Sequence, residues 1–167
     1  LYNAEVFGEA LGTRNELLLS TGHFPGTETV FLASVLRTGG RALVWQPCGP
    51  DRVWPSEGRD LLHELLDKGG LIMTAVAPGF GFSPEGRELQ TCCRMASAQA
   101  LLALNAGTGS HLFSLARTAA DWGRAVMAVP GSIHSPFARG GHRLIRQGAR
   151  LVESSDDILA ELRLAGS

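Results

Sequence analysis

The sequence lacks the long apolar run that a membrane-spanning helix requires. No stretch of its 167 residues approaches the roughly 18 uninterrupted apolar residues of such a span. Residues 1–5 form neither a basic nor an apolar leader, so we expect no signal peptide. Cysteine is scarce, and Cys48, Cys92 and Cys93 match no metal-site spacing, which predicts buried, reduced thiols. Together these absences predict a cytoplasmic protein with no membrane partner.

An excess of one charge is lacking as well. Fifteen Lys and Arg residues against sixteen Asp and Glu residues give a formal net charge of −1. The distribution is uneven, because no acidic residue lies between Asp121 and Glu153, a segment with five arginines and two histidines. A locally basic surface is what binding to a phosphate backbone requires. A solvated helix face is the alternative explanation of the same pattern.

Patterns that indicate catalysis are missing. The G-x-S-x-G nucleophile motif is absent. The glycine-rich segment 105–111 has neither the lysine of a P-loop nor the full G-x-G-x-x-G spacing. The five histidines show no metal-ligand spacing with cysteines or carboxylates. We therefore predict a protein that is not an enzyme and that uses no cofactor or metal.

Short apolar runs alternate with helix-length amphipathic runs along the chain. This alternation predicts an α/β fold, with an open, mostly parallel, Rossmann-like sheet and helices on both faces. We expect a helix ending within 4–11, a loop over 75–87, and Ser56 as the N-cap of the helix 56–68. Without a repeat or a linker, residues 1–167 are predicted to form a single domain. The expected strands are 16–20, 42–45, 70–74, 100–104, 125–129 and 150–152, and the other expected helices are 27–36, 110–122, 141–147 and 156–164.

Four loops are candidates for a binding site. In an open parallel sheet, ligands bind at the carboxyl ends of the strands, where the loops lead into helix N-termini. The four loops that follow expected strands are 20–28, 46–50, 105–111 and 130–136. The loop 105–111 resembles a phosphate cradle, because its glycines let the backbone approach an anion and Ser110 can cap the next helix. A purely structural turn is the alternative there.

The segment 128–159 carries a resemblance to a known family. It contains A-V-P-G-S-I-H-S-P at 128–136, G-G-H-R-L-I-R-Q-G-A-R-L-V at 140–152 and D-D-I-L at 156–159. This resembles the P-G-S-x-x-S-P, L-I-x-x-G-A-x-L-V and D-I-L motifs of the DNA-processing A (DprA/Smf) family. Weaker similarity covers most of the chain, including D-R-V-W-P at 51–55 and the strand–loop–helix stretch 100–124.

The resemblance implies a Rossmann-like domain that binds single-stranded DNA. It also implies a homodimer that helps to load a RecA-type recombinase on DNA during natural transformation in competent cells. Binding of a single strand requires arginines and backbone N–H groups that contact phosphates, and stacking partners for bases. The candidate nucleic-acid-binding residues are Ser20, Gly26, Gly109, Ser110, Gly131, Ser132, His134, Arg139, His142 and Arg143.

The chain departs from the family pattern upstream of this segment. The family's R-N-R-I-I aligns near 90–94, where the arginines are lost from the matching positions. Its S-G-x-x-x-G-I-D-x-x-A-H is reduced to S-T at 20–21 and G-T-E at 26–28, with Leu32 in place of the histidine. Its S-G-S-L has become T-G-S-H at 108–111. The family's first strand and its G-[ST]-R loop would precede Tyr2, so we expect the chain to begin inside the fold.

Two other functions fit parts of the sequence. The eroded arginine motif is consistent with a degenerate family member that serves as a structural or dimerisation module. The segment P-G-T-E at 25–28 echoes the P-G-G-x-G-T-x-x-E signature of lysine-decarboxylase-like (LOG) phosphoribohydrolases, which process nucleotides. Binding to an oligonucleotide and release of base from nucleoside monophosphates would separate these alternatives.

Overall fold

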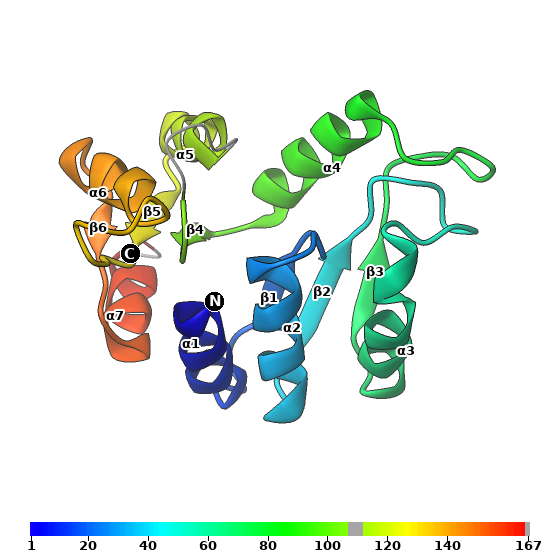
Figure 1. The fold of residues 1–167 in the computed structure, drawn as a ribbon, viewed down its shortest axis with the longest axis horizontal. Helices are drawn as coiled ribbons and strands as arrows, with labels where there is room; N and C mark the ends of the chain where they lie inside the picture. Colours follow the sequence, from blue (N-terminus) through cyan, green and yellow to red (C-terminus); the bar gives the residue numbers. More distant parts are fainter. Residues whose placement is uncertain (107–111, 166–167) are drawn as a thin grey trace. The chain divides into compact units, whose positions relative to one another are not determined.

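The chain folds into two compact units, each built on its own parallel sheet (Figure 1). The computed structural model describes residues 1–106 and 112–165. The units are Leu1–Ala96 and Ser97–Ser167, and each has three hydrogen-bonded strands. The predicted parallel α/β class is confirmed, with the strands divided between two sheets. The single domain expected from the sequence stays a prediction.

The first unit has strand order β1–β2–β3, with all pairs parallel. The register pairs Leu19 with Ala42 and Leu43 with Leu71. Its strands are β1 (Leu19–Thr21), β2 (Ala42–Trp45) and β3 (Leu71–Met73). Its helices are α1 (Tyr2–Gly12), α2 (Thr27–Arg37), the 3-10 turn η1 (Ser56–Gly58), α3 (Arg59–Asp67) and α4 (Pro84–Ser97).

The core of this unit forms around the central strand. All four residues of β2 are buried, as expected for a strand flanked by parallel neighbours. Apolar side chains of α2 and α3 pack against it at helical spacing. The buried cluster comprises Leu32, Val35, Leu36, Ala42, Val44, Leu62 and Leu65.

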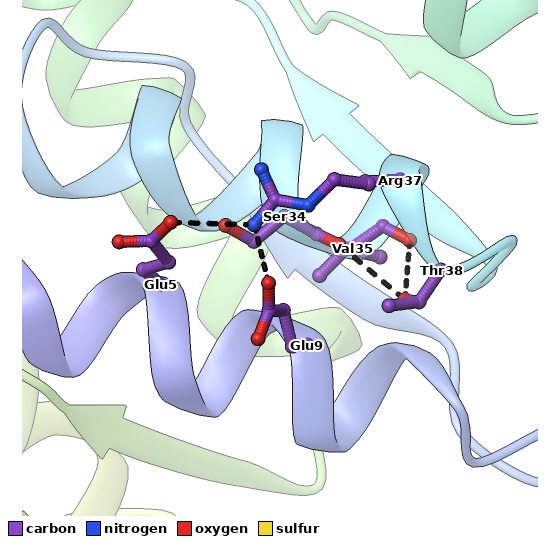
Figure 2. A network of polar contacts seen from close by, with 6 residues as sticks. All are labelled: Glu5, Glu9, Ser34, Val35, Arg37 and Thr38. Carbon is purple, nitrogen blue, oxygen red and sulfur yellow. Dashed lines mark hydrogen bonds and ion pairs between the residues drawn. The ribbon is translucent and has the colours of Figure 1, made fainter.

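Helices α1 and α2 lie side by side at close range (Figure 1). Glycines permit this approach, since a Cβ atom at Gly8 would lie 2.7 Å from the Cβ of Ser34. At the edge of the contact, Arg37 is 3.4 Å from Glu5 Oε1 and 2.5 Å from Glu9 Oε1 (Figure 2). All three charged side chains are about half exposed or more, so close packing stabilises this helix pair more than the ion pairs do.

The loop predicted over 75–87 is wrong in its last residues, because α4 begins at Pro84. The loop ends at Ser83, whose Oγ accepts a hydrogen bond from the N–H of Gly86 at 3.0 Å and so caps the helix. Pro84 occupies the first helical position, where its missing N–H has no effect on the helix. The proline and glycine were therefore signals of a helix start rather than of a continuing loop.

A second correction concerns Ser56. The structure has a 3-10 turn at Ser56–Gly58 before α3, and no side chain caps either element. Instead of capping, the Ser56 hydroxyl donates to Glu57 Oε2 at 3.2 Å.

The prediction of buried cysteines holds only in part, because Cys48 is buried whereas Cys92 is exposed on α4. Helical periodicity turns Gln90 and Met95 inward and leaves Cys92 outside.

The second unit has strand order β4–β5–β6, again parallel. Its strands are β4 (Ala100–Ala103), β5 (Ala125–Ala128) and β6 (Arg150–Leu151). Its helices are α5 (Leu112–Asp121), α6 (Arg139–Arg146) and α7 (Ser155–Ala165), close to the predicted ranges. The buried side chains include Ala103, Leu115, Met127, Ala128, Leu144, Val152 and Ile158.

Candidate nucleic-acid interface

Helix α6 presents a basic face to solvent. Arg139, Arg143 and Arg146 are exposed, whereas Gly140, Gly141 and Leu144 are buried. The spacing of three and four residues places the arginines on one face of the helix. The helix also packs on β5, so α6 combines a buried side with an exposed basic face.

The three arginines are free of carboxylates. Within the described ranges, none of Arg139, Arg143 and Arg146 forms an ion pair. The guanidinium of Arg143 lies over the ring of Phe113 on α5, 4.7 Å from its centroid, which orients the charge without neutralising it. Arg150 differs, because its Nε lies 3.0 Å from Glu161 Oε1. Helix α6 therefore carries three exposed arginines whose charges no carboxylate of the described residues neutralises.

The loop between β5 and α6 is tied to the end of β4. The N–H of Ala106 donates to Phe137 O at 2.9 Å, and the N–H of Gly140 donates to Ala106 O at 2.8 Å. A side chain at position 140 would collide with Ala106, so glycine is needed for this approach. The loops after β4 and β5 thus meet at the carboxyl ends of their strands, as predicted for a binding edge.

His142 contacts this loop. Its Nε2 lies 3.0 Å from Gly131 O and 3.3 Å from Gly131 N, so the ring links α6 to the residue after Pro130. Ser132 and His134 are exposed in the same loop, and the N–H of His134 donates to Ser132 Oγ at 3.3 Å. The structure therefore brings Gly131, Ser132, His134, His142 and the α6 arginines together in one unit.

The remaining predicted residues lie elsewhere. Ser20 is in β1 and Gly26 precedes α2, both in the first unit. The N–H of Gly26 donates to Thr29 Oγ1 at 3.1 Å, so helix capping already engages it. Gly109 and Ser110 lie outside the described residues.

The N-terminus of α2 is occupied by a carboxylate. Glu28 accepts a hydrogen bond from the N–H of Phe24 at 3.0 Å and pairs with Arg94 at 2.6 Å. The two side chains are only 26% and 17% exposed. Glu28 lies in the first turn of α2, where the helix dipole favours a negative charge, and it pairs there with Arg94. Sequence reasoning missed this pair, because 66 positions separate its members.

His23 is buried beside this pair. The side chain is fully buried, and its ring nitrogens have no hydrogen-bond partner among residues 1–106 and 112–165. Burial lowers the pKa of His23 below its usual value, and Glu28 and the backbone of Trp54 and Gly58 oppose this only in part. The imidazole is therefore neutral in the folded chain at pH 7.

The neutral state of His23 predicts a pH-dependent stability. The unfolded chain takes up a proton near pH 6.5, whereas the folded chain resists it, so the free energy of unfolding should fall as the pH drops below about 6.5. Urea unfolding between pH 7.5 and pH 5.5 measures this slope. A His23→Gln variant should show a flatter profile, and the exposed control His134→Gln should keep the original one. Equal slopes in all three proteins would contradict the prediction.

Neither a metal cluster nor a spanning helix is found where the structure is described. No group of three or more His, Cys, Asp and Glu residues there is arranged to hold a metal ion. None of the helices in the described ranges is long and apolar enough to cross a membrane.

These features define a Rossmann-like α/β protein with a basic helix at the carboxyl ends of its strands. Residues 4–163 match the family model described as DNA recombination-mediator protein A. The chain belongs to this family, which contains the DprA and Smf proteins.

Individual relatives support the same family. DNA processing protein DprA of Streptococcus pneumoniae is 30% identical over 155 residues, which are 90% of this chain and 53% of that protein. Protein Smf of Escherichia coli is 29% identical over 95% of this chain and 42% of its own length. This chain thus spans about half the length of these relatives.

Two solved structures share the fold. The X-ray structure of DprA from Streptococcus pneumoniae aligns with a TM-score of 0.86 at 26% identity, over 96% of this chain and 56% of that chain. A DprA structure from Helicobacter pylori, whose description concerns its single-stranded DNA binding mode, aligns with a TM-score of 0.82 at 16% identity. It covers 98% of this chain and 73% of that one.

Proposed function

We propose that this chain binds single-stranded DNA through the basic face of α6 and the loop between β5 and α6. The observation that carries the proposal is the set of three exposed arginines on α6, which form no ion pair with any described residue, beside a loop anchored at the carboxyl ends of β4 and β5. Such a surface attracts phosphates and releases counterions when they bind. Gly131 and Ser132, in the loop that His142 contacts, are exposed in the same unit.

Membership of the family supports the wider proposal. The Helicobacter pylori DprA is described as a single-stranded DNA binder, and the Streptococcus pneumoniae relative as a DNA processing protein. We propose that the whole protein acts in the cytoplasm as a non-enzymatic homodimer that helps to load a RecA-type recombinase. Light scattering tests the dimer, and a strand-exchange assay with RecA tests the loading.

Titration of a labelled single-stranded oligonucleotide across salt concentrations tests the binding face. For the wild type we expect salt-sensitive binding. The double variant Arg139→Ala/Arg143→Ala should weaken binding at low salt by roughly tenfold or more, because two phosphate contacts are lost. The slope of log K against log salt should fall by about 1.4.

Arg117→Ala is the matched control. Arg117 lies on α5 in the same unit, is 86% exposed and pairs weakly with Asp121 at 4.0 Å. Arg117→Ala removes one positive charge, half of the change made by the double variant. The control should bind like the wild type if the position of the arginines rather than the net charge determines affinity. A loss in the control of about half that of the double variant, on a logarithmic scale, would assign the binding to bulk charge, and no binding by the wild type at low salt would refute the proposal.

One observation favours the structural-module alternative. The Glu28–Arg94 pair neutralises an arginine of α4 and places a carboxylate in the first turn of α2, so the first unit offers fewer phosphate contacts there. A chain that dimerises yet fails to bind the oligonucleotide would support this alternative.

A further inference from the structure

The loops that follow β1, β2 and β3 bring three aromatic rings together in the first unit. The rings of Phe24 and Trp54 meet edge to face, with centroids 5.3 Å apart. Trp54 and Phe82 are stacked, with centroids 4.1 Å apart and planes 15° apart. Each residue lies in the loop after a different parallel strand, so the cluster sits at the carboxyl edge where ligands bind such sheets.

An arginine accompanies the rings. The guanidinium of Arg87, in the first turns of α4, lies over the Phe24 ring, 4.7 Å from its centroid. Arg87 is exposed and forms no ion pair within the part of the chain that the structure describes. Its charge is therefore held at the aromatic cluster and is available to an anionic group.

The cluster is held by hydrogen bonds between its loops. The N–H of Gly49 donates to Phe80 O at 2.9 Å, and the N–H of Gly79 donates to Asp51 Oδ1 at 2.8 Å. The N–H of Trp54 donates to Gln46 Oε1 at 3.1 Å. These bonds fix the rings before any ligand arrives, which lowers the entropy lost on binding.

The stack remains partly accessible to solvent at Phe82. Phe82 uses one ring face against Trp54, yet 40% of the residue remains exposed. Phe80, two positions earlier, is 65% exposed. A partly exposed aromatic ring, in the same cluster as an arginine that forms no ion pair with any described residue, suits a flat, π-bearing ring that is attached to an anion.

We propose that this cluster, made of Phe24, Trp54, Phe82 and Arg87, is a nucleobase-stacking site, in which a base of single-stranded DNA stacks on Phe82 and Arg87 contacts the adjoining phosphate. This inference rests on the proposed binding of single-stranded DNA and adds a base contact in the first unit to the phosphate contacts of α6. Stacking of bases on aromatic rings is tolerant of sequence, because every base has a π face.

Comparison of a poly-dT oligonucleotide with an abasic oligonucleotide of equal length tests the stacking. Both carry the same phosphates, so their affinity ratio isolates the bases. The full chain should bind the base-bearing strand about tenfold more tightly. Phe82→Ala should reduce this ratio to about one, whereas Phe82→Trp should keep it. Tyr2→Ala, which removes an exposed aromatic ring on α1, should leave the ratio unchanged.

The result separates this inference from the proposed function. Arg139→Ala/Arg143→Ala should weaken the binding of both oligonucleotides equally and keep their ratio. If the wild type binds both strands with equal affinity and in a salt-sensitive way, the stacking site is wrong while the proposed function stands. The same conclusion follows if Phe82→Ala keeps a tenfold preference for the base-bearing strand. Failure of the wild type to bind either strand overturns both proposals. A thermal melt of Phe82→Ala near that of the wild type ties any lost ratio to the ring.

Discussion

Gly58→Ala is expected to destabilise the first unit severely. A Cβ atom at this position would overlap the imidazole of His23, and it would lie only 3.0 Å from Nδ1, the farthest of the ring atoms it meets. His23 is fully buried, so its ring cannot move aside into solvent. Its backbone has a positive φ of 61°. We expect a loss of about 3 kcal/mol or more in the free energy of unfolding, measured by urea titration.

Two further variants identify the cause. Gly81→Ala is the control, because a Cβ there meets nothing within 4 Å and the glycine has no positive φ. It should unfold like the wild type. His23→Gly in the Gly58→Ala background removes the colliding ring and should recover much of the lost stability. The prediction is contradicted if the second substitution recovers no stability, or if Gly58→Ala alone unfolds like the wild type. Either result would show that the close contact between Gly58 and His23 does not cause the loss of stability.

Strands β2, β3, β4 and β5 were largely predictable, because each consists of consecutive apolar residues. Strand β1 instead lies at Leu19–Thr21, later than the expected 16–20, and two of its three residues are polar. Strand β2 occupies the four positions expected for it, Ala42–Trp45, since A-L-V-W is bounded by polar residues and is buried throughout. Helix α4 was not predicted, because glycine and proline dominate the residues before it. The structure explains Gly86 there by close approach, since a Cβ would lie 2.5 Å from Pro47 O. Such a tertiary requirement has no local sequence signal.

The candidate interface was predictable to a similar extent. The basic face of α6 follows from arginines spaced three and four apart, a pattern visible in the sequence. The aromatic cluster was not predicted, because Phe24, Trp54 and Phe82 come from three loops that only the sheet brings together. The Glu28–Arg94 pair was not predicted either, because its two residues lie 66 positions apart in the sequence. Periodicity reveals residues on one element, whereas sites assembled from several loops require the fold.

Gly140→Ala is the second substitution with a large expected effect, and it acts on the proposed binding face. A Cβ at this position would lie 2.6 Å from the Cβ of Ala106 and closer still to Ala106 O. Ala106 is held by two backbone hydrogen bonds to the segment Phe137–Gly140, so it cannot move away without breaking them. We expect a loss of about 2 kcal/mol in the free energy of unfolding. Oligonucleotide affinity should fall as well, because the loop and α6 lose their shared anchor.

The neighbouring glycine provides the control for this substitution. A Cβ at Gly141 meets only Val129 O, at 3.2 Å, and alanine is intrinsically favoured over glycine inside a helix by about 0.5–1 kcal/mol. Gly141→Ala should therefore unfold within about 0.5 kcal/mol of the wild type and bind the oligonucleotide normally. Equal changes in the free energy of unfolding for the two variants would show that helix propensity, and not the contact with Ala106, determines the effect at both positions. A destabilised Gly140→Ala that keeps full affinity would separate the anchor from binding and place the DNA contacts on α6 alone.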